Sequence, residues 1–376
     1  MRVLHVASGR IYGGVEATLV AMAKYRATCP ELEQQFAYCF PGRLETELKE
    51  AGALHFCIGP VRLSQLWTVA RGRRFFHALL QEKGYDAVIC HSPWTMVIFG
   101  SLVRRKKARL IFWLHDIPMR QYPLLSIMGI LERWAKRIRP DLVVCNSRFT
   151  CSYVNDIYYG VRSQTIYCPV DFKPYHPRTR DQVRQEFGAI NSTTVIIQVS
   201  RLQPWKGQAL HIEALAKIKH IPGWQCWIVG GAQDKGEAQH LSQLRGLANQ
   251  GGIGERVHFL GQRRDVHQLL AAADIFCQPN IRPEPFGIVY IEALHFGLPV
   301  VATDFGGAHE IVTSQCGLLA PPGDAHALAG ILERLVEDVP LRKMLGQHGP
   351  DRARELCSPA ERIAELYQAL KMTVYR

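Results

Sequence analysis

Short apolar segments alternate with helical segments along this 376-residue chain, and this alternation constrains the fold more than any other feature. The strand-like segments share buried-type residues and polar or glycine ends, and they lie at residues 3–7, 86–90, 110–114, 142–145, 195–199, 227–231, 257–261, 274–279 and 300–302. Strands separated by helices predict parallel sheets, so the chain is assigned to the α/β class. Because such sheets bind ligands at the carboxyl ends of their strands, functional residues are expected in the loops that follow them.

The stretch 284–299, EPFGIVYIEALHFGLP, holds two glutamates separated by seven residues. Its spacing predicts Glu284 in a loop and Glu292 within the first turns of a helix that ends at Gly-Leu-Pro. A helix N-terminus favours an anion, and the backbone NH groups available to it belong to Phe286, Gly287 and Ile288. A carboxylate on each side of an anion site suits a nucleotide sugar, which has hydroxyls at both ends and phosphates between. The alternative for such a pair alone is two solvated surface glutamates.

A second group of residues follows the strand at 195–199. Ser-Arg-Leu and then Trp-Lys-Gly place Arg201 and Lys206 on either side of a turn that leads into a helix beginning near Gln208. Arginine grips phosphate in a fork and lysine acts as a point charge, so together they suit a diphosphate. Two solvated cations on a loop are the alternative.

Both groups, in their order along the chain, closely resemble the donor-site signatures of family 4 glycosyltransferases, which have the GT-B fold. The resemblance implies two Rossmann-like parallel-sheet domains facing an interdomain cleft. It implies that Arg201 and Lys206 hold the diphosphate, that Glu284 holds the sugar hydroxyls and that Glu292 holds the ribose. The loop containing Gln262 and Arg263 should contact the nucleotide base through its backbone.

In the amino-terminal half, a glycine pair and a histidine follow predicted strands. Gly13 and Gly14 open a helix, where backbone can approach a ligand closely, although no G-x-G-x-x-G or P-loop motif is present. The resemblance implies that this glycine loop faces the cleft. It also implies that His115, in the sequence Trp-Leu-His-Asp, reaches the donor sugar, whereas from position alone a structural role is the more frequent one.

The length predicts two domains, and the resemblance indicates where they divide. Residues 1–170 are expected to form the acceptor-side domain and residues 171–355 the donor-binding domain. Residues 356–376 are expected to form a helix that crosses back to pack on the first domain, with Ile363, Leu366 and Leu370 as its apolar residues.

The net charge of +12 is confined to the first half. Residues 1–188 carry 27 Lys and Arg against 15 Asp and Glu, whereas residues 189–376 carry 18 of each. Basic residues interleaved with aromatic ones, as around Trp67 and Trp134, suggest a peripheral surface for anionic membrane, although solvated helix faces or an anionic acceptor would also account for them. No nucleic-acid-binding motif is present.

Eleven dispersed cysteines, no apolar run of 18 residues and no secretory leader predict a cytoplasmic protein with free thiols, at most peripheral to the inner face of the cell membrane. The sequence contains no Asp-x-Asp triplet, so no metal and no cofactor are expected.

The function expected from the resemblance is a retaining hexosyltransferase that moves a sugar from a nucleoside-diphosphate sugar to a hydroxyl of a glycan or lipid-linked acceptor. The residues expected to act in catalysis are Arg201, Lys206, Glu284 and His115. A nucleotide-sugar 2-epimerase and a non-catalytic scaffold that binds nucleotide sugar or lipid remain as alternatives.

Overall fold

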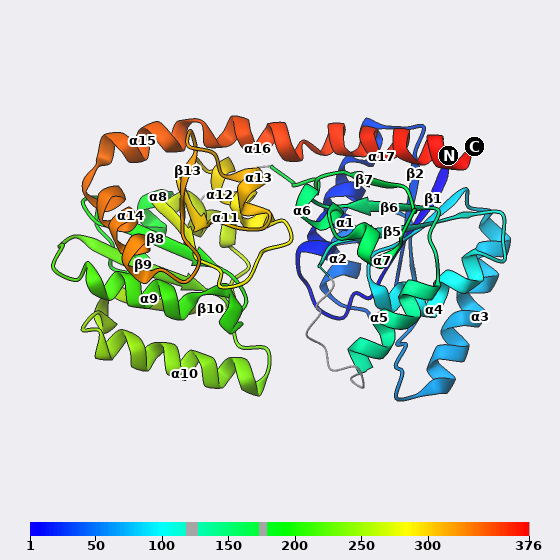
Figure 1. The fold of residues 1–376 in the computed structure, drawn as a ribbon, viewed down its shortest axis with the longest axis horizontal. Coiled ribbons are helices and arrows are strands. Elements are labelled where there is room, and N and C mark those ends of the chain that lie inside the picture. The colour runs from blue at the N-terminus through cyan, green and yellow to red at the C-terminus, as the bar shows by residue number, and fades with distance from the viewer. Residues whose placement is uncertain (118–126, 173–178, 376) are drawn as a thin grey trace. The chain divides into compact units, whose positions relative to one another are not determined.

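A computed structural model describes residues 1–117, 127–172 and 179–375. The chain forms two compact units (Figure 1). Unit 1 comprises Met1–Asp171 together with Cys357–Arg376, and unit 2 comprises Phe172–Leu356. Among the described helices, none combines the length and apolar character needed to cross a membrane.

Unit 1 contains a seven-stranded parallel sheet in the order β3-β2-β1-β4-β5-β6-β7. Its strands are β1 (Arg2–Ala7), β2 (Glu33–Tyr38), β3 (His55–Cys57), β4 (Ala87–Cys90), β5 (Arg109–Leu114), β6 (Leu142–Cys145) and β7 (Ser163–Thr165). Its α-helices are α1 (Gly14–Tyr25), α2 (Arg43–Glu50), α3 (Leu66–Lys83), α4 (Pro93–Val103), α5 (Ile127–Arg137), α6 (Arg148–Cys151), α7 (Val154–Ile157) and α17 (Pro359–Val374).

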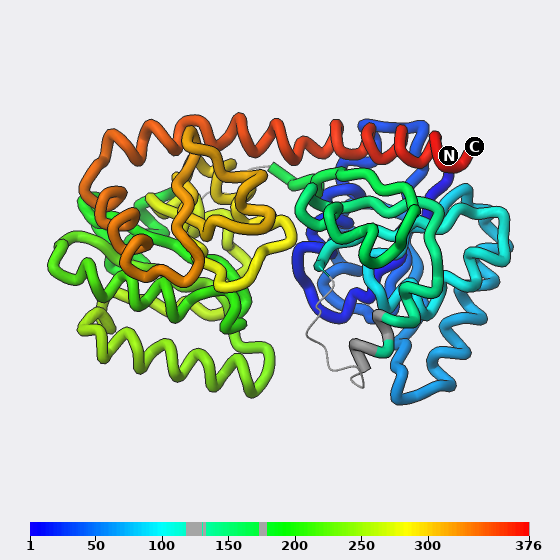
Figure 2. The backbone as a smooth tube through the Cα atoms, viewed as in Figure 1, coloured from blue at the N-terminus to red at the C-terminus, as the bar shows by residue number. Residues whose placement is uncertain are grey.

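Alternate residues of the unit 1 strands face two separate hydrophobic clusters, one on each side of the sheet. The last helix, α17, belongs to one of them: Ile363, Leu366 and Leu370 are fully buried in the same cluster as Leu19 and Met22 of α1. The red end of the tube in Figure 2 is this helix. The chain therefore returns to unit 1 after it has completed unit 2.

Unit 2 contains a six-stranded parallel sheet in the order β10-β9-β8-β11-β12-β13. Its strands are β8 (Thr194–Val199), β9 (Trp224–Val229), β10 (Val257–Gly261), β11 (Ile275–Gln278), β12 (Val300–Thr303) and β13 (Gly317–Ala320). Its α-helices are α8 (Arg180–Glu186), α9 (Gln208–Lys217), α10 (Lys235–Gln250), α11 (Val266–Ala272), α12 (Ile288–His295), α13 (Ala308–Ile311), α14 (Ala325–Glu337), α15 (Val339–Gln347) and α16 (Gly349–Cys357). Each sheet starts in its middle and grows outward to both sides, as in the Rossmann fold, so the predicted fold class is confirmed.

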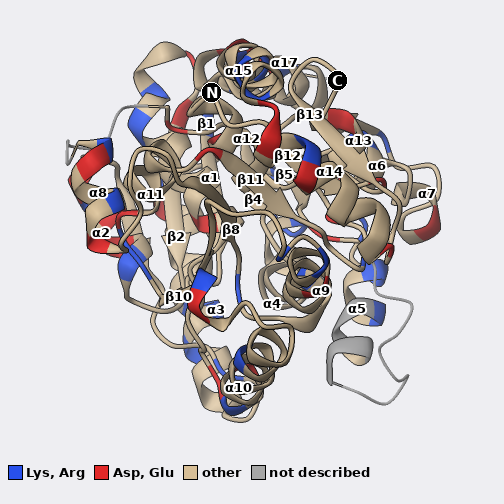
Figure 3. Ribbon diagram, turned by 90° about the vertical axis from the view of Figure 1, so that its left-hand side faces the viewer, with Lys and Arg blue, Asp and Glu red and all other residues tan. Residues whose placement is uncertain are grey.

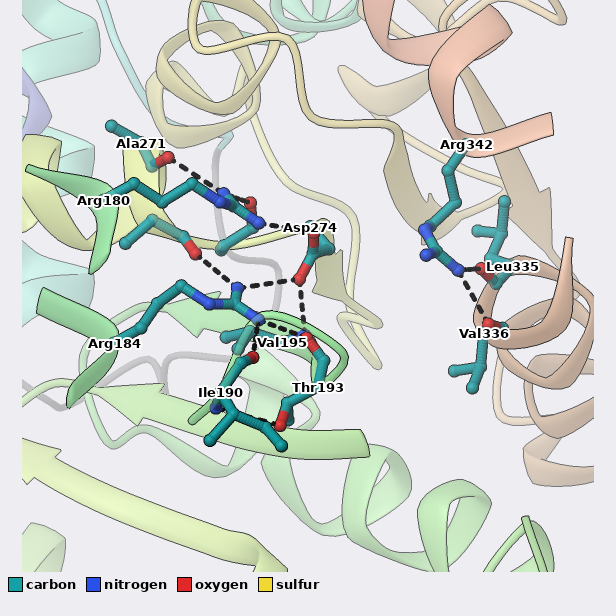
Figure 4. A network of polar contacts seen from close by, with 12 residues as sticks. Arg180, Arg184, Ile190, Thr193, Val195, Ala271, Asp274, Leu335, Val336 and Arg342 are labelled. Carbon is teal, nitrogen blue, oxygen red and sulfur yellow. Dashed lines mark hydrogen bonds and ion pairs between the residues drawn. The ribbon is translucent and has the colours of Figure 1, made fainter. Parts of the chain in front are cut away.

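A polar clamp ties α8 to the starts of the two central strands of unit 2. Basic and acidic residues alternate along α8 (Figure 3), and Figure 4 shows Arg180 and Arg184 of this helix converging on Asp274. Arg184, only 2% exposed, lies 3.1 Å from Asp274 Oδ2, and the same oxygen accepts a hydrogen bond of 2.8 Å from the backbone NH of Val195. Arg184 also donates to the carbonyl oxygens of Ala272, Ile190 and Thr193. The clamp thereby fixes β8 next to β11, the pair of strands that positions the site described next.

Candidate functional site

The site in unit 2 lies where the order of the strands reverses direction. β8 and β11 are neighbours in the middle of the sheet, but the connection from β8 leads away to one side and that from β11 to the other. The carboxyl ends of two such neighbouring strands are the usual ligand position in a doubly wound sheet. Arg201 and Lys206 follow β8, and Glu284 follows β11.

Lys206 and Glu284 meet across these two loops. Lys206 Nζ lies 2.6 Å from Glu284 Oε2, with side chains only 14% and 13% exposed. Asn280 Nδ2 donates to the same carboxylate oxygen at 2.7 Å, and the Lys206 ammonium lies 4.0 Å from the ring centre of Trp205. Among the described residues Glu284 Oε1 has no hydrogen-bond partner, so it is available to a ligand hydroxyl, and the lysine retains two further N–H donors.

Glycines of the following loop hold Glu284 in place. The NH of Gly307 donates to the carbonyl oxygen of Glu284 at 2.8 Å. Gly306 has φ +65°, and a Cβ atom there would lie 2.6 Å from that same oxygen. The sequence Phe-Gly-Gly after β12 is therefore required by the close approach of two backbones, which fixes the direction of the carboxylate.

Arg201 is paired with a helix that lies far from it in sequence. Its guanidinium lies 2.6 Å from Glu237 Oε1 on α10, and Glu237 is 6% exposed. The other carboxylate oxygen, Oε2, accepts a hydrogen bond of 2.8 Å from the NH of Gln233. Arg201 Nε is buried without a partner among the described residues. Glu237 therefore orients the guanidinium without occupying all of its five donors.

Glu292 lies inside α12, as the spacing predicted, with Gly287 as the residue that caps the helix. Its Oε1 is 3.7 Å from Nε2 of His267 on α11. Gly287 has φ +103°, Phe286 is buried, and Ile288 begins the helix. The NH groups of the first turn of α12 thus lie a few residues after Glu284 in the chain.

The loop after β10 holds Gln262 and Arg263. Gly230 donates its NH to the carbonyl oxygen of Gly261 at 2.9 Å, which joins the ends of β9 and β10. Arg263 donates to both oxygens of Asp265 at 2.8 Å and to Glu186 at 3.1 Å. The side chain of Arg263 is therefore engaged by acids, and the expected contact of this loop with the base through its backbone stays a prediction.

In unit 1, Gly13 caps α1 and Gly14 begins it. The NH of Gly13 donates to Oε2 of Glu16 at 3.0 Å, and burial raises the pKa of Glu16. This buried carboxyl satisfies one of the free NH groups of the helix N-terminus, a partner that the sequence interpretation overlooked.

His115 follows β5 and is joined to two further histidines. Its Nε2 lies 2.9 Å from His91 Nδ1, and His91 Nε2 lies 3.0 Å from His5 Nδ1. The ring of Trp113 stacks on His115, with centroids 5.6 Å apart and planes 6° apart. Asn146 Nδ2 donates to the backbone oxygen of His115 at 3.0 Å.

In unit 2 the sequence interpretation missed three residues that position the expected site residues, namely Glu237, Asn280 and His267. Asn280 directly follows the β11 segment, so its position after a central strand was an available signal. Glu237 lies 36 residues from Arg201 and carried no local signal. In the part of the chain that the structure describes, no group of three or more His, Cys, Asp or Glu side chains could hold a metal ion.

Comparison with known families covers almost the whole chain. Residues 12–173 match the family described as "Glycosyltransferase Family 4", and residues 179–352 match the family described as "Glycosyl transferases group 1". The first match lies in unit 1 except for its last two residues, and the second lies in unit 2.

Individual relatives agree with these matches. A phosphatidyl-myo-inositol mannosyltransferase of Mycobacterium leprae is 33% identical over 303 residues, 77% of this chain and 75% of that protein. A GDP-mannose-dependent monoacylated alpha-(1-6)-phosphatidylinositol monomannoside mannosyltransferase of Corynebacterium glutamicum is 36% identical over 187 residues; the match spans 47% of each chain, about half the length of that relative. The crystal structure of Anabaena HepE in complex with UDP and glucose has a TM-score of 0.85 and 27% identity, covering 99% of this chain and 100% of that chain.

Proposed function

This chain belongs to glycosyltransferase family 4, and we propose that it transfers a sugar from a nucleoside-diphosphate sugar to a hydroxyl of a glycan or lipid-linked acceptor, with retention of anomeric configuration. The observation that carries the proposal is the meeting of Lys206 and Glu284 at the reversal point of the unit 2 sheet. The ammonium group of Lys206 can bind phosphate and the carboxylate of Glu284 can accept hydrogen bonds from sugar hydroxyls, so one nucleotide sugar can contact both.

The charge at this site suits a departing diphosphate. Negative charge develops on the diphosphate as the bond from the anomeric carbon to its oxygen breaks. Lys206, Arg201 and the NH groups that open α12 are positive groups held in fixed positions, and such preorganised groups lower the barrier without reorganising. These cations can do the work that a divalent metal does elsewhere, so we propose metal-independent transfer.

The remaining roles follow from the positions of the carboxylates. Glu284 Oε1 accepts hydrogen bonds from hydroxyls of the donor sugar, while Glu292, inside α12, accepts from the ribose hydroxyls. The acceptor hydroxyl attacks the anomeric carbon on the face that the diphosphate leaves, and its proton passes to the departing phosphate oxygen. His115, Gly13 and Gly14 of unit 1 complete the proposed set of donor contacts.

Uridine diphosphate sugars are the first donors to test. HepE, whose likeness covers the whole chain, was crystallised with UDP and glucose, whereas the match to the GDP-mannose-dependent enzyme covers about half of it. The acceptor proposed is a lipid-linked or surface glycan, because the mannosyltransferase relatives are named for phosphatidylinositol acceptors.

A basic and apolar surface of unit 1 suits such an acceptor. It consists of α3 and the end of α4, where Leu66 and Trp67 are 74% and 63% exposed. Arg73, Arg74 and Arg105 line a hollow of about 580 Å³ there, and none of the three forms an ion pair among the described residues. Basic residues also mark α5, as blue segments in Figure 3. Arg74 and Arg105, which have no acidic partner among the described residues, lie beside these exposed apolar side chains and favour the surface of an anionic membrane, so we propose peripheral attachment of a cytoplasmic protein.

The proposal is tested first by thermal unfolding with UDP-, GDP- and ADP-sugars, since a ligand that binds the folded state raises the melting temperature. The stabilising donor is then incubated with lipid-linked and soluble glycan acceptors, with and without excess chelator, and the product anomer is read by NMR. Transfer with retention, unchanged by chelator, is expected.

The alternatives give different results in the same assay. Conversion of the donor to its C2 epimer without an acceptor would indicate an epimerase. Stabilisation by a donor without transfer or epimerisation would indicate a binding scaffold. Loss of activity in chelator, restored by magnesium, would contradict the proposed role of the cations.

A further inference from the structure

Three histidines form a continuous chain of ring contacts inside unit 1. His5 and His91 are 1% and 2% exposed, and His115 is partly exposed where β5 ends. The chain runs from His5 Nδ1 to His91 Nε2 at 3.0 Å, and from His91 Nδ1 to His115 Nε2 at 2.9 Å. It therefore connects the buried middle of the sheet to the edge at which ligands of such sheets bind.

The register of the sheet produces this arrangement. His5 on β1 lies opposite Ile89 on β4, and His91 is two residues beyond Ile89. The pairing of Cys90 with Phe112 places His91 level with Trp113 of β5, and His115 is two residues further. Because side chains two residues apart point to the same face, the three histidines lie on one face of the sheet, each nearer the carboxyl end of its strand than the one before.

We propose that His91 is a positioning residue, and that with His5 it forms a relay which fixes the ring of His115 and determines which of its nitrogens carries the proton. All three rings remain neutral near pH 7, because burial lowers the pKa of His5 and of His115 to about 3 and that of His91 well below its ordinary value. Each neutral ring has one N–H donor and one acceptor nitrogen. The two contacts are therefore satisfied only when all the protons point the same way along the chain.

Two proton arrangements meet this condition. In the outward one, His5 Nδ1–H donates to His91 Nε2 and His91 Nδ1–H donates to His115 Nε2, so that His115 carries its proton on Nδ1. In the inward one, His115 Nε2–H donates to His91 Nδ1, His91 Nε2–H donates to His5 Nδ1, and His5 carries its proton on Nε2. The number of protons is the same in both.

The buried end of the chain can serve either arrangement. His5 Nε2 is buried without a partner among the described residues, and so are both amide atoms of the neighbouring Gln34. A small rotation would let the Gln34 amide donate to a bare His5 Nε2 or accept from His5 Nε2–H. The direction that the whole chain adopts then determines whether His115 presents Nδ1–H or a bare Nδ1 to a ligand at the sheet edge.

The wild-type protein tests the direction of the relay directly. Long-range ¹H–¹⁵N correlation spectra of protein with ¹⁵N-labelled histidine show which nitrogen of each ring carries the proton. We expect all three histidines to have the same tautomer at neutral pH without any ligand, either Nδ1–H throughout or Nε2–H throughout. Different tautomers among the three rings would overturn the proposal. This measurement does not depend on the proposed transferase activity, although the kinetic test below rests on it.

A matched pair of variants tests the positioning role. Asparagine carries its amide near the place of histidine Nδ1, and glutamine carries it near the place of Nε2. His91→Asn therefore retains a partner for His115 and loses that of His5, whereas His91→Gln does the reverse. We expect both variants to show both His115 tautomers, because each breaks the relay at one contact, and to lower kcat with little change in donor KM. The loss should be about threefold for His91→Asn, which keeps a partner for the His115 ring, and at least about tenfold for His91→Gln, which does not.

A single His115 tautomer and wild-type kcat in both variants would show that His91 only fills space. If neither variant folds, the wild-type spectrum still decides the proton direction on which the proposal rests.

Discussion

At the residue scale, Lys206 pairs with Glu284 and Arg201 pairs with Glu237. Because the two cations have different acidic partners, a similar loss of turnover in their variants would not come from one disturbed ion pair. We expect Lys206→Ala and Arg201→Ala each to lower kcat about a hundredfold or more, because each removes positive charge from the departing diphosphate. Lys217→Ala, an exposed lysine in the last turn of α9, is the control and should be neutral. Near-normal kcat in both site variants would exclude the diphosphate assignment.

Glu284 and Glu292 should separate in their effects. Glu292→Ala should weaken the binding of free nucleoside diphosphate about ten- to a hundredfold, since it removes the charged acceptor of hydrogen bonds donated by the ribose hydroxyls. Glu284→Ala should mainly lower kcat, and Glu284→Gln, which keeps an acceptor for Asn280, should lower it without loss of stability. Calorimetry with UDP and steady-state kinetics measure the two effects. Weaker UDP binding in Glu284→Ala than in Glu292→Ala would reverse the two roles.

At the scale of secondary-structure elements, the Arg184–Asp274 ion pair is expected to support unit 2. Arg184→Ala should reduce the free energy of unfolding by about 3–5 kcal/mol, because it leaves a carboxylate and several carbonyl groups without their buried partner. Arg180→Ala removes the neighbouring, 43% exposed arginine from the same aspartate and should cost no more than about 1 kcal/mol. Urea unfolding of the two variants measures the difference, and similar losses would contradict the importance given to burial.

Buried histidines on β1 and α9 make the stability depend on pH. Burial lowers the pKa of His5 and His211 to about 3, and His211 Nδ1 lies 2.9 Å from Gln198 Oε1. The unfolded chain protonates both below its ordinary pKa of about 6.5, whereas the folded chain does not, so stability is complete above that pH and falls as the pH is lowered toward 3. Each histidine should contribute about 1.4 kcal/mol per pH unit in this range.

Urea unfolding between about pH 7.5 and pH 5 measures this dependence. His211→Gln should reduce the pH dependence of the free energy of unfolding, measured in the transition of unit 2, by the contribution of this one histidine. An unchanged slope in that variant would show that His211 is protonated equally in the folded and unfolded chain.

At the scale of the whole molecule, unit 1 should bind anionic vesicles and release them at high salt. Each basic residue near an anionic surface contributes about 1 kcal/mol, so four or five give weak, reversible attachment. Arg74→Glu with Arg105→Glu should lower recovery in vesicle flotation, whereas Lys343→Glu, an exposed lysine of unit 2, should not. Equal recovery with neutral and anionic vesicles would exclude this surface as an anionic-membrane site and leave the glycosyltransferase assignment unaffected.

Much of this molecule follows from the order of residues along the chain. The nine predicted strand segments are strands, because apolar runs that end in glycine or polar residues are typical of buried parallel strands. Arg201, Lys206 and Glu284 were expected together since parallel strands bring their carboxyl ends to one edge, and Lys206 and Glu284 do meet there. The roles of these residues in binding and catalysis stay predictions. β2, with the polar sequence Glu-Gln-Gln, was not recognised because Glu33 and Gln35 meet their partners Arg2 and Tyr85 only in the folded sheet.

Other features were decided by the tertiary structure alone. Glu237 reaches Arg201 only because α10 packs beside the β8 loop, and no pattern in the sequence links residues 36 positions apart. His5, His91 and His115 are separate histidines in the sequence. They form one chain because, in the register of β1, β4 and β5, each histidine lies two residues beyond the position opposite the histidine before it. Local sequence determines which segments become strands and which residues end them, whereas side-chain partners across strands depend on register, which the packing of the whole sheet sets.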